Sequence, residues 1–204
     1  MKKVVICNIP MRKNEMRYIY KSDDLSLITS DKAVFYPINA FLEKHLEKSD
    51  EVKVILLVKR DLQNASSQNV SDFIDEIMSV NSVGANIVYK IIETDYSEEQ
   101  FIHEKLMADI IDEIDDNAHI QCDITYGPKD LPIVLFSALN FAEKFLHCDI
   151  DNILYGKATF LDGKPTDTKL CDMVPLYYLN SVTNTIRCDD SQKARKMLKD
   201  LLSL

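Results

Sequence analysis

A hydroxyl, a glycine and a cation alternate within one short stretch of the sequence, Cys122 to Pro132 (CDITYGPKDLP). Thr125 and Lys129 are residue types that bind phosphate oxygens, and Gly127 between them lets a ligand approach the backbone closely. The stretch begins like the end of a buried strand and runs into the helical pattern IVLFSALNFAEKFL, whose first N–H groups are further anion donors. A plainer interpretation stays open. The stretch is then only a strand-to-helix corner, in which Asp130 caps the helix and Lys129 lies in solvent.

Basic side chains also follow two other predicted strands. Arg12 and Lys13 lie in the loop after the first strand, residues 8–14, and Lys59 and Arg60 begin the loop after the second strand. Ligands of open parallel sheets bind at the carboxyl ends of the strands, so these cations and the lysine of the first stretch predict a focused positive site. Taken alone, the Lys-Arg pair is a solvated strand end. The predicted guest is an anion, such as a phosphate-bearing small molecule.

Other chemistries lack their sequence patterns. The four histidines have no metal-ligand spacing, and the five cysteines never form Cys-x-x-Cys, so neither a zinc site nor a disulfide framework is expected. No Ser-His-Asp or Cys-His order stands out. The absence of Gly-x-Gly-x-x-Gly and Gly-Lys-Ser/Thr patterns removes the main support for dinucleotide and nucleoside triphosphate binding. We therefore expect no metal and no cofactor.

Length and composition favour a single domain spanning residues 1–204. The chain is 46% hydrophobic and 28% charged, which is typical of a compact protein rather than a disordered one. Its net charge of −9 argues against binding long nucleic acid through a basic surface. No apolar run approaches the roughly 18 residues of a membrane span, and KKVVICNIPM is too interrupted for a signal peptide. The sequence predicts a cytoplasmic protein with reduced thiols and no membrane contact.

Apolar runs alternate with helical patterns along most of the chain. The predicted strands are Val4–Cys7, Val52–Val58, Ile87–Ile92, Ile120–Thr125 and Ile150–Tyr155. Helical spacing of apolar residues between them predicts βαβ units, hence an α/β, Rossmann-like, mostly parallel sheet flanked by helices. A small extra β ribbon is expected at Met16–Tyr20 (MRYIY), and a hairpin around Asp162–Gly163. The chain ends in a predicted helix with Ser191 as its N-cap.

The helix after the opening stretch is apolar nearly all round, with nine apolar residues between Leu131 and Leu146. A helix packed on a sheet needs only one apolar stripe, so something else must bury the surplus. Either a neighbouring element or a second copy of the chain would do so. A twofold axis along this helix would bring two Thr125–Lys129 corners together into one symmetric pocket.

The segment DITYGPKDLPIVLFSALNFAEKF resembles the Asp-x-Thr-x-Gly-x-Arg/Lys-x-x-Pro strand-loop-helix signature of CARF domains, the CRISPR-associated Rossmann-fold sensors of type III immunity. The resemblance extends to MRYIY, VILLVKRD, NILYGK and CDMVPLYYLN, and so covers most of the chain. It implies a homodimer that binds cyclic oligoadenylate, most often the ring of four adenylates, across its interface. Many relatives have His-Gly-Phe-Arg where this chain has Tyr-Gly-Pro-Lys, so its cation lacks the bidentate fork of arginine.

The resemblance implies a pocket built from two loops. Its residues are Asn8, Ile9 and Arg12 from the first loop, and Thr125, Gly127 and Lys129, with the backbone of Tyr126 and Pro128, from the second. Members of the family usually carry an effector, such as a nuclease, and no segment here resembles one. A separate or missing effector domain is therefore expected.

Three functions remain open from the sequence. The first is a sensor of cyclic oligoadenylate whose output lies in a partner. The second is a metal-independent ring nuclease, in which Lys129 would stabilise developing charge and Thr125 would donate a hydrogen bond. The third is a transcriptional regulator, which would require a helix-turn-helix that the last predicted helix alone does not form.

Overall fold

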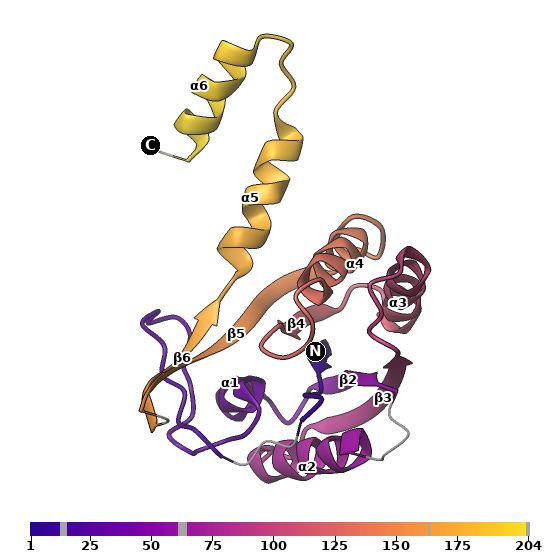
Figure 1. Ribbon diagram of the computed structural model, residues 1–204, viewed down its shortest axis with the longest axis vertical. Coiled ribbons are helices and arrows are strands. Elements are labelled where there is room, and N and C mark those ends of the chain that lie inside the picture. The colour runs from indigo at the N-terminus through magenta and orange to yellow at the C-terminus, as the bar shows by residue number, and fades with distance from the viewer. Residues whose placement is uncertain (13–15, 61–64, 163, 203–204) are drawn as a thin grey trace. The chain divides into compact units, whose positions relative to one another are not determined.

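The computed structural model describes residues 1–12, 16–60, 65–162 and 164–202 (Figure 1). The chain forms two compact units, Met1–Asp172 and Met173–Leu204. The elements of the first unit are β1 (Lys2–Asn8), α1 (Pro37–His45), β2 (Glu51–Lys59), α2 (Ala65–Val80), β3 (Asn86–Thr94), α3 (Gln100–Glu113), β4 (His119–Asp123), α4 (Leu131–Phe145), β5 (Asp149–Leu161) and β6 (Lys164–Asp172). The second unit contains α5 (Val174–Thr185) and α6 (Ser191–Leu201).

The first unit is built on one six-stranded sheet with the strand order β3-β2-β1-β4-β5-β6. Strands β1 to β5 are parallel, and β6 is antiparallel to β5. The predicted α/β, mostly parallel architecture is therefore confirmed. The chain runs outward from β1 to β3 and then returns to β4 on the other side of β1. The strand order thus reverses between β1 and β4, and a crevice at such a switch point is where folds of this type bind ligands.

The central strands are buried because helices cover both faces of the sheet. Val5 and Cys7 belong to the core cluster shared with α1 and α2, whereas Val4 and Ile6 point to the opposite face. Figure 1 shows α1 and α2 on one side of the sheet and α3 and α4 on the other. This two-sided burial explains why the β1 and β2 segments read as continuous apolar runs.

Two strand predictions differ from the structure. The Ile87–Ile92 run was expected to be buried on both faces, but β3 lies at the sheet edge, and Val88 and Ile91 are exposed. Strand β5 extends well past Tyr155 because its second half pairs with β6 instead of a parallel neighbour. Asp162 lies at the predicted hairpin turn with a φ of +50°, and Gly163 lies outside the described residues.

The β ribbon predicted at Met16–Tyr20 consists of isolated bridges in the structure. Tyr18 forms a single antiparallel bridge with Val34, through two backbone hydrogen bonds of 2.9 Å. Lys21 forms a second bridge, with Lys169 on β6. The segment therefore packs beside the sheet without extending it.

A buried carboxylate fixes the start of α1. Glu76 on α2 accepts hydrogen bonds from the backbone amides of Phe35 (2.7 Å) and Tyr36 (3.0 Å) and from the side chain of Asn39 (3.0 Å). The helix then begins at Pro37, whose missing N–H and fixed φ suit the first helical position. These bonds hold the amino end of α1 against α2.

The second unit begins with a helix that apolar periodicity did not predict, α5. The predicted C-terminal helix is present as α6, but Ser191 is its first residue and not its N-cap. Asp190 is the N-cap, and its carboxylate accepts from the amides of Gln192 (2.8 Å) and Lys193 (3.0 Å). Aspartate and serine both cap helices, so the sequence alone does not decide which of these two adjacent residues is the N-cap.

Candidate functional site

The two predicted site loops are neighbours at the switch point. Cys7 on β1 and Asp123 on β4 are paired in the sheet, so Asn8 and the Thr125–Lys129 loop leave adjacent strands at the same edge. The sequence placed both loops at carboxyl ends of strands, and the structure shows that those two strands are in contact. Lys59 ends β2, on the other side of β1, and Arg60 follows it.

Gly127 packs directly against the side chain of Asn8. Its φ is +111°, and a Cβ atom there would lie 2.5 Å from Asn8 Nδ2 and 2.7 Å from Leu131 Cδ2. Only glycine combines this backbone conformation with such a close approach. Gly127 was predicted to let a ligand approach the backbone closely. In the structure, the side chain of Asn8 at the end of β1 makes this close approach.

The buried side-chain amide of Asn8 has a hydrogen-bond partner for its oxygen but none, among the described residues, for its nitrogen. The residue is 1% exposed, and its Oδ1 accepts a close hydrogen bond from the Tyr96 hydroxyl. Its Nδ2 is buried and finds no acceptor within the described part of the chain. Because Tyr96 holds the oxygen, the amide nitrogen is directed away from it, toward Gly127. A buried donor without an acceptor costs free energy until a partner is supplied.

Tyr96 is a site residue that the sequence analysis missed. It follows β3, two strands away from β1, and has a φ of +49°. Burial raises the pKa of its hydroxyl above the ordinary value, so the group stays a neutral donor. No local pattern marks this tyrosine, since its partner lies 88 residues away in the sequence.

Thr125 is engaged in holding the loop in place. Its Oγ1 accepts from the Gly156 amide on β5 at 2.7 Å, and its own amide donates to Asp123 Oδ1 at 2.7 Å. Gly156 is required here because a Cβ atom would collide with the ring of Pro37. The Thr125 hydroxyl is thus used as an acceptor within the fold.

Asp123 is a buried carboxyl group at the centre of this arrangement. Burial raises its pKa from 3.8 to about 6, while hydrogen bonds from Thr125 and from the Ile38 amide (3.2 Å) favour its charged form. Burial and the neighbouring Asp123 also raise the thiol pKa values of Cys7 and Cys122, which keeps both cysteines protonated. The thiols are therefore poor nucleophiles.

Of the other residues in the second loop, Tyr126 and Pro128 stabilise the fold, whereas Lys129 is exposed. Tyr126 donates from its hydroxyl to the Phe35 carbonyl at 2.8 Å, which pins its ring over the start of α1. The Pro128 carbonyl accepts from the Leu131 amide at 3.2 Å and so begins the turn into α4. Lys129 is exposed, and it forms no ion pair with any residue that the structure describes. Lys129 is thus available to bind an anion.

The predicted positive cluster is smaller in the structure than in the sequence. Arg60 forms ion pairs with Asp95 (3.3 Å) and Glu93 (3.9 Å) near the end of β3, so acidic neighbours offset its charge. Lys59 and Arg12 are exposed, and Lys13 lies outside the described residues. Ile9 is buried in the core cluster, so its side chain does not reach the surface.

Asp130 does not cap α4, which corrects the plainer interpretation of the motif. It occupies the N-cap position without a side-chain cap bond. Its carboxylate instead meets Nε2 of His103 on α3 at 2.5 Å. This pair lies at a hollow of about 280 Å³ between α3 and α4, where Ile133 forms part of the wall. The Asp130 backbone carbonyl, and not its carboxylate, accepts from the amides of Ile133 (2.9 Å) and Val134 (3.3 Å) at the start of α4.

Comparisons with known proteins add no family to this description. No protein-family model matches the chain, and no curated protein matches it. Within the described residues, no three His, Cys, Asp or Glu side chains are grouped so as to hold a metal ion. No described helix has the length and apolar character needed to cross a bilayer.

Proposed function

We propose that the site between β1 and β4 binds cyclic oligoadenylate, with the ring of four adenylates as the preferred ligand, and that the protein is a homodimeric sensor of type III CRISPR signalling. The observation that carries the proposal is the contact between the Thr125–Lys129 loop and Asn8 at the switch point of the sheet. The same loop bears the CARF-like motif Asp-x-Thr-x-Gly-x-Lys-x-x-Pro.

The chemistry of the loop suits a phosphate-bearing ring. Lys129 supplies an exposed positive charge without an ionic partner among the described residues. The Asn8 amide lies just beneath Gly127 as a further donor once the loop adjusts. Few charged side chains lie in the loop itself, which agrees with a ligand held largely by backbone groups.

The exposed face of α4 supports the dimer. Ile133 is 69% exposed and Phe145 is 64% exposed, although six residues on the opposite face of this helix are buried in the fold. The apolar surplus predicted from the sequence therefore remains on the surface of the single chain. A second copy packed against this face would bury it, and α4 starts at the binding loop, so two loops would approach one another.

Sensing is favoured over ring cleavage by the state of Thr125. A catalytic hydroxyl must reach the ligand, whereas that of Thr125 accepts a hydrogen bond from the Gly156 amide on β5. The nuclease alternative then depends on Lys129 alone to stabilise the charge of the transition state. A lone surface cation serves binding equally well.

The test is to incubate the purified protein with cyclic tetra-adenylate, to measure affinity by calorimetry and to follow products by chromatography over hours. We expect binding with the ring intact, and an affinity at least tenfold lower for Lys129→Ala. Lys48→Ala, an exposed lysine between α1 and β2, is the matched control and should bind like the wild type. Linear products that disappear with Lys129→Ala would instead establish a ring nuclease. If neither this ring nor the six-membered ring binds, the proposed ligand class is wrong.

A further inference from the structure

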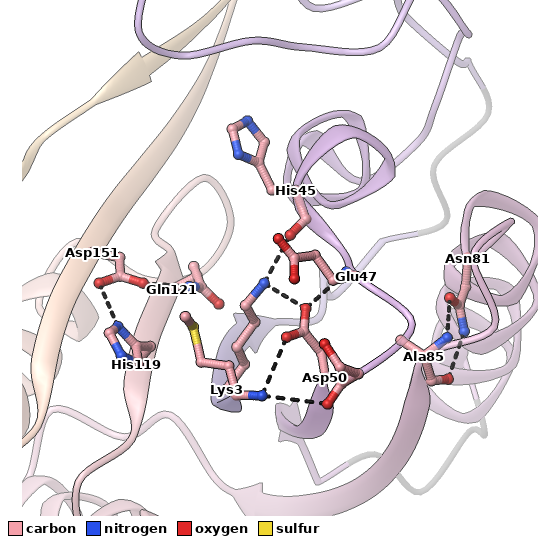
Figure 2. A network of polar contacts seen from close by, with 11 residues as sticks. Lys3, His45, Glu47, Asp50, Asn81, Ala85, His119, Gln121 and Asp151 are labelled. Atoms are coloured by element: carbon pink, nitrogen blue, oxygen red, sulfur yellow. Dashed lines mark hydrogen bonds and ion pairs between the residues drawn. The ribbon is translucent and has the colours of Figure 1, made fainter.

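A second cavity, of about 290 Å³, lies at the opposite end of the sheet from the proposed cyclic oligoadenylate site. It is formed where β1, β4 and β5 begin and where α1 ends, and Figure 2 shows the polar side chains around it. Its polar wall contains Lys3, His119, Gln121 and Asp151, and its apolar wall is formed in part by Phe41. The residues of this cavity take no part in the carboxyl-edge site.

Gln121 places an unpaired acceptor in this cavity. The residue is 3% exposed, and its Nε2 donates to Asp151 Oδ2 at 2.9 Å. That bond fixes the orientation of the amide, because the reverse orientation would set the amide oxygen against a carboxylate. The Oε1 atom is buried and receives no hydrogen bond from the residues that the structure describes. Gln121 is thus a residue of the cavity wall whose buried acceptor lacks a donor among the described residues.

A β-bulge in β5 orients the side chain of Asp151 toward His119 and Gln121. His119 and Ile120 pair with Asp149 and Ile150, but Gln121 pairs with Asn152, so Asp151 is the additional residue on β5. Bulges reorient side chains and are frequent beside binding sites. The Asp151 carboxylate binds both His119 Nδ1, at 3.1 Å, and Gln121 Nε2. Figure 2 shows the side chains of His119 and Asp151 joined in this way.

The opposite wall is a flat aromatic surface. The His45 ring stacks on Phe41 with their centroids 3.8 Å apart and their planes inclined by 13°. His45 Nε2 lies 3.0 Å from the Ile28 carbonyl and so donates to it, which leaves Nδ1 as an acceptor in the neutral ring. Burial lowers the pKa of His45, and Lys3 lowers it further, so the ring is neutral at physiological pH.

The charges at the cavity favour a donor over an acceptor as guest. The Lys3 ammonium group is already bound to Asp50 at 2.6 Å and to the His45 carbonyl at 2.8 Å. Two carboxylates lie near His119. That of Asp151 is 3.1 Å from Nδ1, and that of Asp149 is 3.9 Å from Nε2. An anion would meet these carboxylates, whereas a group with N–H donors would satisfy them and Gln121 together.

We propose that this cavity binds a small planar molecule that carries N–H donors, of the amidine or amino-heteroaromatic class. Its donors would bind Gln121 Oε1 and the Asp151 carboxylate, and its ring would lie against the Phe41 and His45 wall. Ligand pockets range from about 300 to 1,000 Å³, so this cavity suits a guest of one or two rings.

The test uses two probes of the same shape and opposite hydrogen-bonding character, benzamidine and benzoate. Binding is followed by NMR chemical-shift changes of the full chain during titration. We expect benzamidine to shift the side-chain amide signals of Gln121 saturably, and benzoate to bind at least tenfold more weakly. No saturable shift with benzamidine, or equal binding of the two probes, would overturn the proposal and leave a cavity that holds only water.

Two glutamine variants separate binding from structure. Gln121→Met removes the buried acceptor at similar side-chain volume, and Gln68→Met changes an exposed glutamine on α2. We expect benzamidine affinity to fall at least tenfold in the first variant and to stay within twofold in the second. Without a probe, thermal unfolding shows whether Gln121→Met is folded, because the substitution also removes the hydrogen bond from Gln121 Nε2 to Asp151. Unchanged benzamidine affinity in a folded Gln121→Met variant would contradict the proposal.

Discussion

The Thr125 hydroxyl accepts a hydrogen bond of 2.7 Å from the Gly156 amide, and this bond ties the loop after β4 to β5. The threonine thus holds the loop in place whether or not a ligand is bound. Loss of the hydroxyl leaves the Gly156 amide without this acceptor, whereas the buried Asp123 carboxylate keeps its hydrogen bonds from the Thr125 and Ile38 amides.

The first prediction follows from this bond. Thr125→Val keeps the shape of the side chain and removes the hydroxyl, so the free energy of unfolding should fall by about 1–3 kcal/mol. Thr125→Ser retains the hydroxyl and should lose less than half as much. Urea denaturation followed by circular dichroism measures both variants. A valine variant as stable as the wild type would show that the bond contributes nothing to folding.

The second prediction concerns the contact of Gly127 with Asn8. Gly127→Ala adds a methyl group 2.5 Å from Asn8 Nδ2 at a φ of +111°, so it combines backbone strain with a steric clash. We expect a loss of stability of roughly 2–4 kcal/mol, above the 1–3 kcal/mol of strained backbone alone.

Gly84 provides the matched control for that substitution. It also has a positive φ, of +73°, but a Cβ atom there would meet no atom within 4 Å. Gly84→Ala should therefore lower the free energy of unfolding by only about 1 kcal/mol, which is the cost of placing alanine at a positive φ. Thermal unfolding of the two variants side by side gives the comparison. Equal losses would mean that Asn8 moves aside freely.

The third prediction is a pH dependence caused by Asp123. Its pKa of about 6 in the folded protein lies above the ordinary value of 3.8. Between these two pH values the folded state keeps the proton that the unfolded state releases. The group therefore contributes stability at low pH that is lost as the pH rises through about 6, on the order of 3 kcal/mol in all.

Asp123→Asn isolates this contribution, because asparagine does not titrate. The variant is expected to be less stable than the wild type at pH 4, since its NH₂ group faces a donor. The difference should narrow as the pH rises toward 7. Urea midpoints at several pH values measure it. A difference that does not change with pH would place the pKa of Asp123 near its ordinary value.

Most of the fold was predictable because its parallel strands and most of its helices have a local signal, whereas α5 has none. Continuous apolar runs predicted the buried strands, and helical spacing predicted the helices between them. The edge position of β3 was not predictable in this way, since its apolar run resembles those of β1 and β2. Strand order depends on how whole helices pack on the sheet, and no short segment encodes it.

The site was predictable only in part. The motif from Asp123 to Pro132 located one loop, and the parallel sheet located its neighbour after β1. The bond between Tyr96 and Asn8 has no sequence signal, because it joins residues 88 positions apart. The positive charge of the site was also overestimated, because the sequence does not show which acidic residues lie beside a cation. The sequence shows Arg60 as a cation at a strand end, whereas the fold places Asp95 and Glu93 beside it.

The last prediction compares these two kinds of cation in the binding of cyclic tetra-adenylate. Arg60 lies across β1 from the loop and is paired with two carboxylates, whereas Lys129 lies in the loop and has no ionic partner among the described residues. Arg60→Ala should change ligand affinity less than twofold. Its effect on the free energy of unfolding should stay within about 0.5 kcal/mol, as expected of exposed ion pairs. Lys129→Ala should weaken binding at least tenfold, and more strongly at low salt than at high salt, since an exposed charge is screened. Calorimetric titrations at two salt concentrations measure both variants. An arginine variant that loses as much affinity as the lysine variant would move the ligand toward β2 and contradict a site centred between β1 and β4.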